Sequence, residues 1–204
     1  MYLTPPLNRA SLSTYICLLV VSLLGSILFR PDALQFAEKQ NTLDQLTDYD
    51  SMTALQIDVP GIFTYPVLQQ PEDNDVYVSN RRNSLTQFRM AAREGITGVL
   101  AHNYLSGSDF FRLHVGQKIS VLYDHEKIGQ YQVTHIHRYQ KLEPANLRSD
   151  LIDLETNLRL TTPEVYNLHY RGHHQLILQT CLEGEGRLDW GLLFVMAEPT
   201  GENP

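Results

Sequence analysis

Hydrophobic residues occur in short runs that turn residues separate, and this pattern predicts a mainly β domain over residues 55–199. The segment LQIDVPGIFTYPVLQ, 55–69, indicates two strands joined by a turn at Pro60-Gly61. Further strands are expected at 76–79, 96–103, 119–123, 131–142, 175–181 and 192–197. Many short strands with few helices are typical of a closed or nearly closed β-barrel decorated by short helices.

Strict alternation in YQVTHIHRYQKL, 131–142, predicts which side chains of that long strand lie together. Successive side chains of a strand point to opposite faces. One face is therefore expected to carry Tyr131, Val133, His135, His137 and Tyr139.

Two helices are expected between the strands. The segment SLTQFRMAARE, 84–94, has apolar residues at helical spacing, with Ser84 as a plausible N-cap and Gly95 as the stop. Within the mixed segment 145–173, Thr162 precedes Pro163, which is the preferred order for the start of a helix.

The N-terminal part of the chain has a different character. Twenty residues without a charge lie between Arg9 and Arg30, and about 20 apolar residues are needed to cross a membrane as a helix. We expect a cytoplasmic tail at 1–11, an uncleaved transmembrane anchor at 12–29 and a stalk at 30–54, with 200–204 as a C-terminal tail. A cleaved signal peptide and a buried core helix are the alternatives. The expected location is the cell membrane, with a single span and the domain outside the cytoplasm.

Charge excludes one class of partner. The chain has 16 Lys and Arg against 23 Asp and Glu, for a net charge of −7. A nucleic-acid surface needs a basic patch or stripe, so no nucleic-acid partner is expected.

The two cysteines, Cys17 and Cys181, cannot plausibly pair, because Cys17 lies within the expected anchor. An unpaired thiol outside the cytoplasm is usually avoided or used. Cys181 ends the apolar run LILQTC beside the acidic, glycine-broken loop LEGEGR. A small buried hydrophobe is the simpler interpretation of this residue, and a nucleophile is the alternative that its position at a strand end favours.

A histidine has the same position in another predicted strand. His102 ends VLAHN as Cys181 ends LILQTC, so both side chains reach one rim of the barrel if the two strands are parallel neighbours. A thiol next to an imidazole is the basis of nucleophilic acyl transfer. Arg187, six residues beyond Cys181, is the candidate donor for the oxyanion, and a solvated loop charge is its alternative role.

Three further residues are candidate members of a substrate groove. Asn103 can orient the His102 ring or form the turn, and Thr180 can order the site or act only as a strand residue. Trp190 can flank a peptide groove or pack in the rim. The pairs His135/His137 and His173/His174 lack the three or four ligands that zinc usually requires, so no metal or cofactor is expected.

The order of these motifs resembles the sortases, the membrane-anchored cysteine transpeptidases of bacterial surfaces, in a form similar to class E or F or to unclassified members. The resemblance covers roughly residues 55–197. It rests on IDVPGIFTYPV (57–67), GVLAHN (98–103), the spaced residues Phe110 or Phe111, Leu113, Gly116 and Ile119, and LILQTC (176–181).

The resemblance implies a closed eight-stranded β-barrel in which His102, Cys181 and an arginine line a groove. Cys181 would attack a threonine carbonyl in the C-terminal sorting signal of a substrate protein. An amine from a cell-wall precursor or a pilin-type lysine would then resolve the thioester. The histidine would protonate the leaving amine, and the arginine would steady the substrate or the oxyanion.

Two features depart from the sortase pattern. The sortase arginine usually opens the last strand, whereas Arg187 lies four or five residues before LLFVMA. Either the strand begins earlier and Arg187 still points into the groove, or the usual arginine is missing. His102 and Cys181 are 79 positions apart, which is somewhat long, and the extra length falls in 145–173. A catalytically silent, sortase-like surface-binding module and a cysteine hydrolase without a transferase role are the alternative functions.

Overall fold

The structure, a computed structural model, describes residues 53–171 and 175–200. All of them belong to one compact unit, Asp48–Pro204. The expected cytoplasmic tail and anchor, most of the stalk, the C-terminal tail from residue 201, Cys17 and the pair His173/His174 lie outside the described residues. Within the described ranges, no helix combines the length and apolar character needed to span a membrane.

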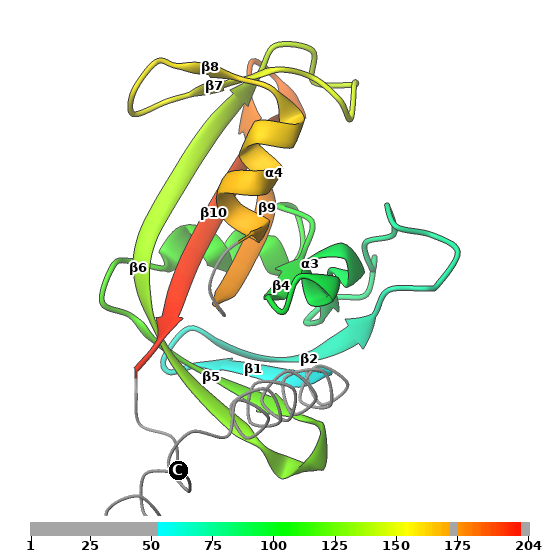
Figure 1. The fold of residues 1–204 in the computed structure, drawn as a ribbon, viewed down its shortest axis with the longest axis vertical. Helices are drawn as coiled ribbons and strands as arrows, with labels where there is room; N and C mark the ends of the chain where they lie inside the picture. The colour runs from blue at the N-terminus through cyan, green and yellow to red at the C-terminus, as the bar shows by residue number, and fades with distance from the viewer. Residues whose placement is uncertain (1–52, 172–174, 201–204) are drawn as a thin grey trace, which may run out of the picture. The chain divides into compact units, whose positions relative to one another are not determined.

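Eight strands close into a barrel of mixed parallel and antiparallel strands, as expected (Figure 1). Around the barrel they are β10 (Arg187–Pro199), β9 (Leu176–Gly184), β4 (Thr97–Leu100), β3 (Leu85–Gln87), β2 (Phe63–Gln69), β1 (Ala54–Val59), β5 (Lys118–Tyr123) and β6 (Ile128–Lys141). The pairing of β6 with β10 closes the ring, and the pairs β2–β3 and β4–β9 are parallel.

Short elements decorate this barrel. Strands β7 (Leu151–Asp153) and β8 (Arg159–Leu160) continue the sheet outward from β6. The α-helices are α3 (Arg89–Arg93) and α4 (Thr162–Tyr170), and the 3₁₀ helices are η1 (Ser106–Arg112) and η2 (Asp124–Glu126).

The alternation of β9 separates two hydrophobic clusters. Leu176 and Leu178 belong to the cluster that fills the barrel, whereas Ile177 belongs to a second cluster on the outer face. Helix α4 covers that outer cluster, where Tyr170 packs edge-on against Phe194 of β10. Cys181 is an odd-numbered residue of β9 and therefore lies on the outer face with Ile177.

The expected single face of 131–142 is wrong, because β6 contains a bulge. The register with β10 shifts between the pairs Val133–Ala197 and His135–Met196, so that Thr134 is an extra residue. An extra residue reverses the alternation that follows it. Tyr131 and Val133 accordingly pack inside the barrel, whereas His137 contacts Tyr139 and His169 on the outer face.

The expected helix over 84–94 is only half present. Leu85–Gln87 forms β3, which pairs in parallel with β2, and the helix begins at Arg89. Ser84 is therefore not an N-cap, although Gly95, at φ 74°, ends the helix as expected. The inter-strand hydrogen bonds of the barrel outweigh the weak helical preference of this segment.

Two smaller expectations also change. The N-cap of α4 is Thr161 rather than Thr162, because its side chain accepts from the Glu164 backbone and completes a capping box. Residues 76–79 form no strand. Ser79 instead bonds through its backbone N–H to the Thr86 hydroxyl at 2.9 Å.

Gly191 is packed so closely that it should tolerate no side chain. A Cβ there would lie 2.2 Å from the backbone oxygen of Tyr139 on β6. We expect Gly191→Ala to lower the free energy of unfolding by about 1–3 kcal/mol, because the β6–β10 pair must separate to admit a methyl group. Urea unfolding measures this, with Glu198→Ala, an exposed change on the same strand, as the control. An unchanged unfolding midpoint for Gly191→Ala would contradict this account of the packing.

Candidate active site

Parallel pairing of β4 and β9 brings the expected histidine and cysteine to the same rim of the barrel. Leu100 lies opposite Gln179, and the Ala101 N–H donates to the Gln179 carbonyl at 3.2 Å. His102 is two residues beyond Leu100, and Cys181 is two residues beyond Gln179. The register therefore brings the chain at His102 and the chain at Cys181 to the same end of this strand pair.

The chain that follows β4 is folded back tightly over the end of the strand. The backbone N–H groups of Leu105 and Gly107 both donate to the His102 carbonyl, at 2.9 and 3.0 Å. The buried Thr180 hydroxyl donates to the Ala101 carbonyl at 2.8 Å, and a Cβ on Gly107 would approach that hydroxyl to 2.4 Å. Thr180 thus joins β9 to the loop that carries His102.

The His102 ring stacks on Tyr104, with centroids 5.1 Å apart. Among the described residues, no hydrogen bond joins this ring to the Cys181 thiol. Catalytic hydrogen bonds are often long before the substrate binds, so this arrangement is compatible with a Cys–His pair. The Asn103 amide donates to the Leu188 carbonyl at 2.8 Å and so connects the loop to β10.

Cys181 is half-buried, and its environment opposes ionisation. Burial is the main cause that raises the pKa of the thiol above its usual range. The Lys141 ammonium acts to lower that pKa, and the Asp189 carboxylate acts to raise it. Lys141 ends β6 and was not among the residues expected at the site. Lys141 was missed because the bulge in β6 determines whether its side chain lies on the inner or the outer face of the barrel, and the sequence pattern does not show the bulge.

The last strand begins at Arg187, earlier than its apolar run LLFVMA. Glu185 and Gly186 both have positive φ, 52° and 72°, as a tight two-residue hairpin turn requires. Arg187 pairs with Gly184 directly after this turn. The register then shifts before Gly191, so that Leu192, and not an arginine, lies opposite Cys181.

Arg187 is engaged with an acidic neighbour at the hairpin end. Its guanidinium lies 3.1 Å from Asp189, and the two side chains are 48% and 41% exposed. The hydrogen bond from Arg187 is the main cause that lowers the pKa of Asp189. Arg187 also lines an open surface hollow together with the segment Glu143, Pro144, Ala145 and Asn146.

Trp190 lies in the shifted part of β10. It packs against the cluster inside the barrel, and a Cβ on Gly184 would approach its ring to 2.5 Å. The indole Nε1 is buried and, within the described part of the chain, has no hydrogen-bond partner. These contacts place the indole against the hairpin.

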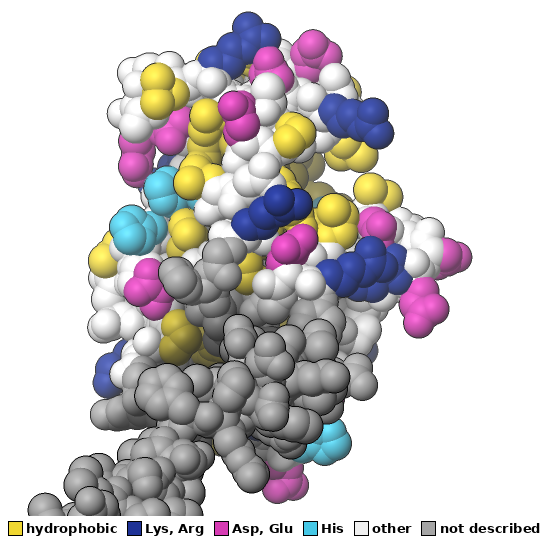
Figure 2. Space-filling model, viewed as in Figure 1, with side chains coloured by type: hydrophobic (Ala, Val, Ile, Leu, Met, Phe, Trp, Pro, Cys, Tyr) yellow, Lys and Arg dark blue, Asp and Glu magenta, His cyan; other side chains and the backbone are white. Residues whose placement is uncertain are grey.

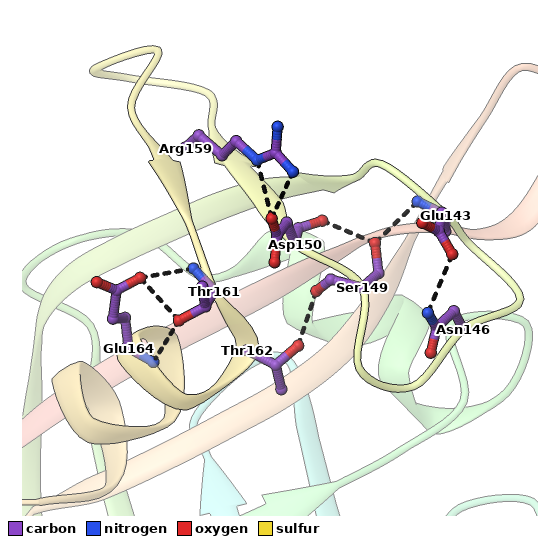
Figure 3. Close-up of polar contacts among 8 residues, drawn as sticks. All are labelled: Glu143, Asn146, Ser149, Asp150, Arg159, Thr161, Thr162 and Glu164. Carbon is purple, nitrogen blue, oxygen red and sulfur yellow. Dashed lines mark hydrogen bonds and ion pairs between the residues drawn. The ribbon is translucent and has the colours of Figure 1, made fainter.

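A polar network orders the long connection between β6 and α4 (Figure 3). The buried Ser149 hydroxyl accepts from the Glu143 N–H at 2.8 Å, and the Ser149 carbonyl accepts from Thr162 at 2.7 Å. Arg159 bonds Asp150 at 2.6 and 2.8 Å. The segment that lines the hollow is therefore attached to the start of α4.

Metal-binding residue types are dispersed over the described part of the domain. Among residues 53–171 and 175–200, no group of three or more His, Cys, Asp and Glu side chains is placed to hold a metal ion. His135 and His137 stack on one another with centroids 5.9 Å apart. On the face drawn in Figure 2, acidic and basic side chains are interspersed with hydrophobic ones.

Comparison with solved structures identifies the fold. The domain is similar to sortase A from Corynebacterium diphtheriae, with a TM-score of 0.51 and 14% identity over 76% of this chain and 63% of that one. The domain has the sortase fold. Sortase D5 from Clostridium perfringens (TM-score 0.47, 15% identity, 80% and 89% covered) and sortase A from Listeria monocytogenes (0.46, 14%, 73% and 87%) are also similar.

Comparison of the sequence with known families and proteins does not extend the assignment beyond the fold. Neither a family model nor a curated protein matches the chain. The similarity therefore lies in the arrangement of the strands, and the chemistry must be argued from the site itself.

Proposed function

We propose that this sortase-fold domain is a cysteine transpeptidase that cleaves a sorting-signal peptide and transfers it to an amine. Cys181 supplies the nucleophilic sulfur, and a carbon–sulfur bond forms at the peptide carbonyl. The carbon–nitrogen bond then breaks, and the leaving amine takes the proton that the thiol lost, by way of the His102 ring.

The observation that carries this proposal is the parallel register of β4 and β9. It supports a thiol and an imidazole at one rim, from segments 79 positions apart, because the chain at His102 and the chain at Cys181 lie at the same end of these strands. The groove residues proposed beside them are Asn103, Thr180 and Trp190.

The second half of the reaction needs an acceptor. An amine of a cell-wall precursor or a pilin-type lysine attacks the thioester, forms the new amide and releases the Cys181 sulfur, which regains a proton. Anchoring by residues 12–29, with the domain outside the cytoplasm, belongs to the same proposal, because the uncharged run is long enough to span a bilayer.

A silent, sortase-like binding module is the second candidate. The raised pKa of the Cys181 thiol favours it, since a protonated thiol is a poor nucleophile. The two candidates differ in whether a covalent adduct forms.

The direct test is capture of the acyl-enzyme. Full-length protein in detergent is incubated with a library of labelled peptides that mimic C-terminal sorting signals, without an acceptor amine. We expect a mass increase on the proteolytic fragment that contains Cys181, reversed by hydroxylamine. Addition of triglycine should release the label as a new amide.

Two results would oppose the proposal. Peptide cleavage with the adduct on another residue would assign the chemistry elsewhere. Absence of both cleavage and adduct across the library would favour the binding module.

A further inference from the structure

Three adjacent strands place a lysine on the same face as Cys181. Leu192 of β10 lies opposite Cys181 of β9 on one side and opposite Tyr139 of β6 on the other. Lys141 is two residues beyond Tyr139 on β6. Because residues two apart on a strand share a face, Lys141 lies on the face that carries Cys181.

Strand β10 places a leucine, and not a cation, opposite the thiol. Its residue opposite Cys181 is Leu192. The preceding residue, Gly191, faces the barrel interior, because a Cβ there would lie 3.3 Å from the side chain of Leu182 in the inner cluster. Arg187, farther along toward the hairpin, is paired with Asp189 at 3.1 Å.

The Lys141 ammonium is held in position by the segment beside it. This half-buried side chain donates to the Pro144 carbonyl at 3.4 Å. Pro144 follows Glu143, whose backbone bonds the buried Ser149 hydroxyl in the network of Figure 3. The lysine therefore has a defined anchor point at the edge of the site.

The charged groups around Cys181 come from three strands and one strand end. Lys141 lies on β6 and Asp189 on β10, and these two charges act on the thiol. Glu183, which is exposed, and Arg187 lie on the adjoining parts of β9 and β10, while His102 follows β4. Lys141 acts to lower the pKa of the thiol, and Asp189 acts to raise it.

We propose that Lys141 supplies the positive charge of the Cys181 centre, in place of an arginine on the last strand. Its ammonium stabilises the anionic sulfur and, on the proposed function, the anionic oxygen of the tetrahedral intermediate. Arg187 affects the thiol only indirectly, because its positive charge offsets the negative charge of Asp189.

Thiol reactivity tests this inference without a peptide substrate. Full-length protein in detergent is alkylated with iodoacetamide from pH 6 to 10, and the rate is followed on the Cys181 fragment by mass spectrometry, separately from Cys17. The variants are Lys141→Gln, which removes the charge, Lys141→Arg, which keeps it, and Arg187→Gln. Lys141→Met, an unbranched neutral change, is the second charge-removing variant.

We expect Lys141→Gln and Lys141→Met to shift the alkylation profile to higher pH and to slow alkylation at pH 7 by about 3- to 10-fold. Lys141→Arg should stay within about 2-fold of the wild type, because it restores the charge. Arg187→Gln should produce a smaller slowing than Lys141→Gln. Superimposable profiles for the wild type and both neutral variants would overturn the inference, as would a larger effect of Arg187→Gln.

The test separates this inference from the proposed function. A shifted profile in a protein that forms no acyl-enzyme would leave Lys141 as the thiol's cation and refute transpeptidation. If the protein forms an acyl-enzyme but the Lys141 variants alkylate with the same pH profile as the wild type, transpeptidation would be supported and the role of the lysine refuted.

Discussion

Replacing Cys181 by alanine is expected to abolish peptide cleavage, with a loss of about 10⁴-fold or more in kcat. The variant has no atom that can form the thioester, and water attack on an unactivated amide is extremely slow. Cys181 is half-buried on the outer face, so the change should alter the free energy of unfolding by only about 1 kcal/mol. Steady-state cleavage of the labelled peptide and urea unfolding of the same preparation measure the two quantities.

The matched controls separate chemistry from packing. Cys181→Ser keeps a similar shape, but a hydroxyl is much harder to deprotonate than a thiol, so the variant should be nearly as inactive as alanine. Glu198→Gln changes an exposed residue at the other end of β10 and should keep wild-type turnover. Turnover retained by Cys181→Ala would remove the thiol from the mechanism.

Acid should destabilise the domain through one buried histidine. His169 of α4 is completely buried, stacks on Phe194 with centroids 4.2 Å apart and bonds the Tyr139 hydroxyl through Nε2 at 2.9 Å. Burial, and then the nearby His137, lower its pKa from 6.5 to about 3, while Asp153 acts in the opposite direction.

The sign of the effect follows from which state binds the proton. Below about pH 6.5 an unfolded histidine takes up a proton, whereas folded His169 stays neutral until about pH 3. The stability that the neutral ring contributes is therefore complete above pH 6.5 and is lost as the pH falls toward 3. The loss amounts to about 5 kcal/mol at most.

Urea unfolding of the wild type and His169→Gln between pH 7.5 and 4 measures this contribution. The glutamine does not titrate, so the stability difference between the two proteins should shrink as the pH falls. His135→Gln, which changes an exposed histidine of β6, should follow the wild type. Parallel curves for the wild type and His169→Gln would show that His169 is not the acid-sensitive group.

The strands that carry the candidate site could be predicted because their patterns are local. Runs such as LILQTC are apolar enough to read as buried strands, although β9 continues three residues beyond Cys181, to Gly184. Placing His102 beside Cys181 needed one more fact, namely that β4 and β9 are parallel neighbours. The sequence left that fact as a condition, and the register shows that the two strands meet it.

Other features of the site depend on contacts that no local pattern contains. The bulge at Thr134 reverses the faces of β6 and so brings Lys141 onto the outer face. The approach of Tyr139 to Gly191 excludes a side chain from the position before the last apolar run. Both features result from the pairing of β6 with β10, which are far apart in the sequence. The register of such distant strands depends on the packing of the whole barrel.

The sequence alone was sufficient to determine the β-rich composition of the domain, the uncharged N-terminal run, and the strands near which Cys181 and His102 lie, because each follows from the order of neighbouring residues. Cys181 does not end its strand as expected, since β9 continues to Gly184, and His102 follows the end of β4. Only the tertiary structure decided that residues 85–87 form a strand, that Arg187 forms an ion pair with Asp189, and that Lys141 shares a face with Cys181. The physical reason is that strand pairing satisfies backbone hydrogen bonds between distant segments, and closure of the barrel then determines which side of each strand faces the site.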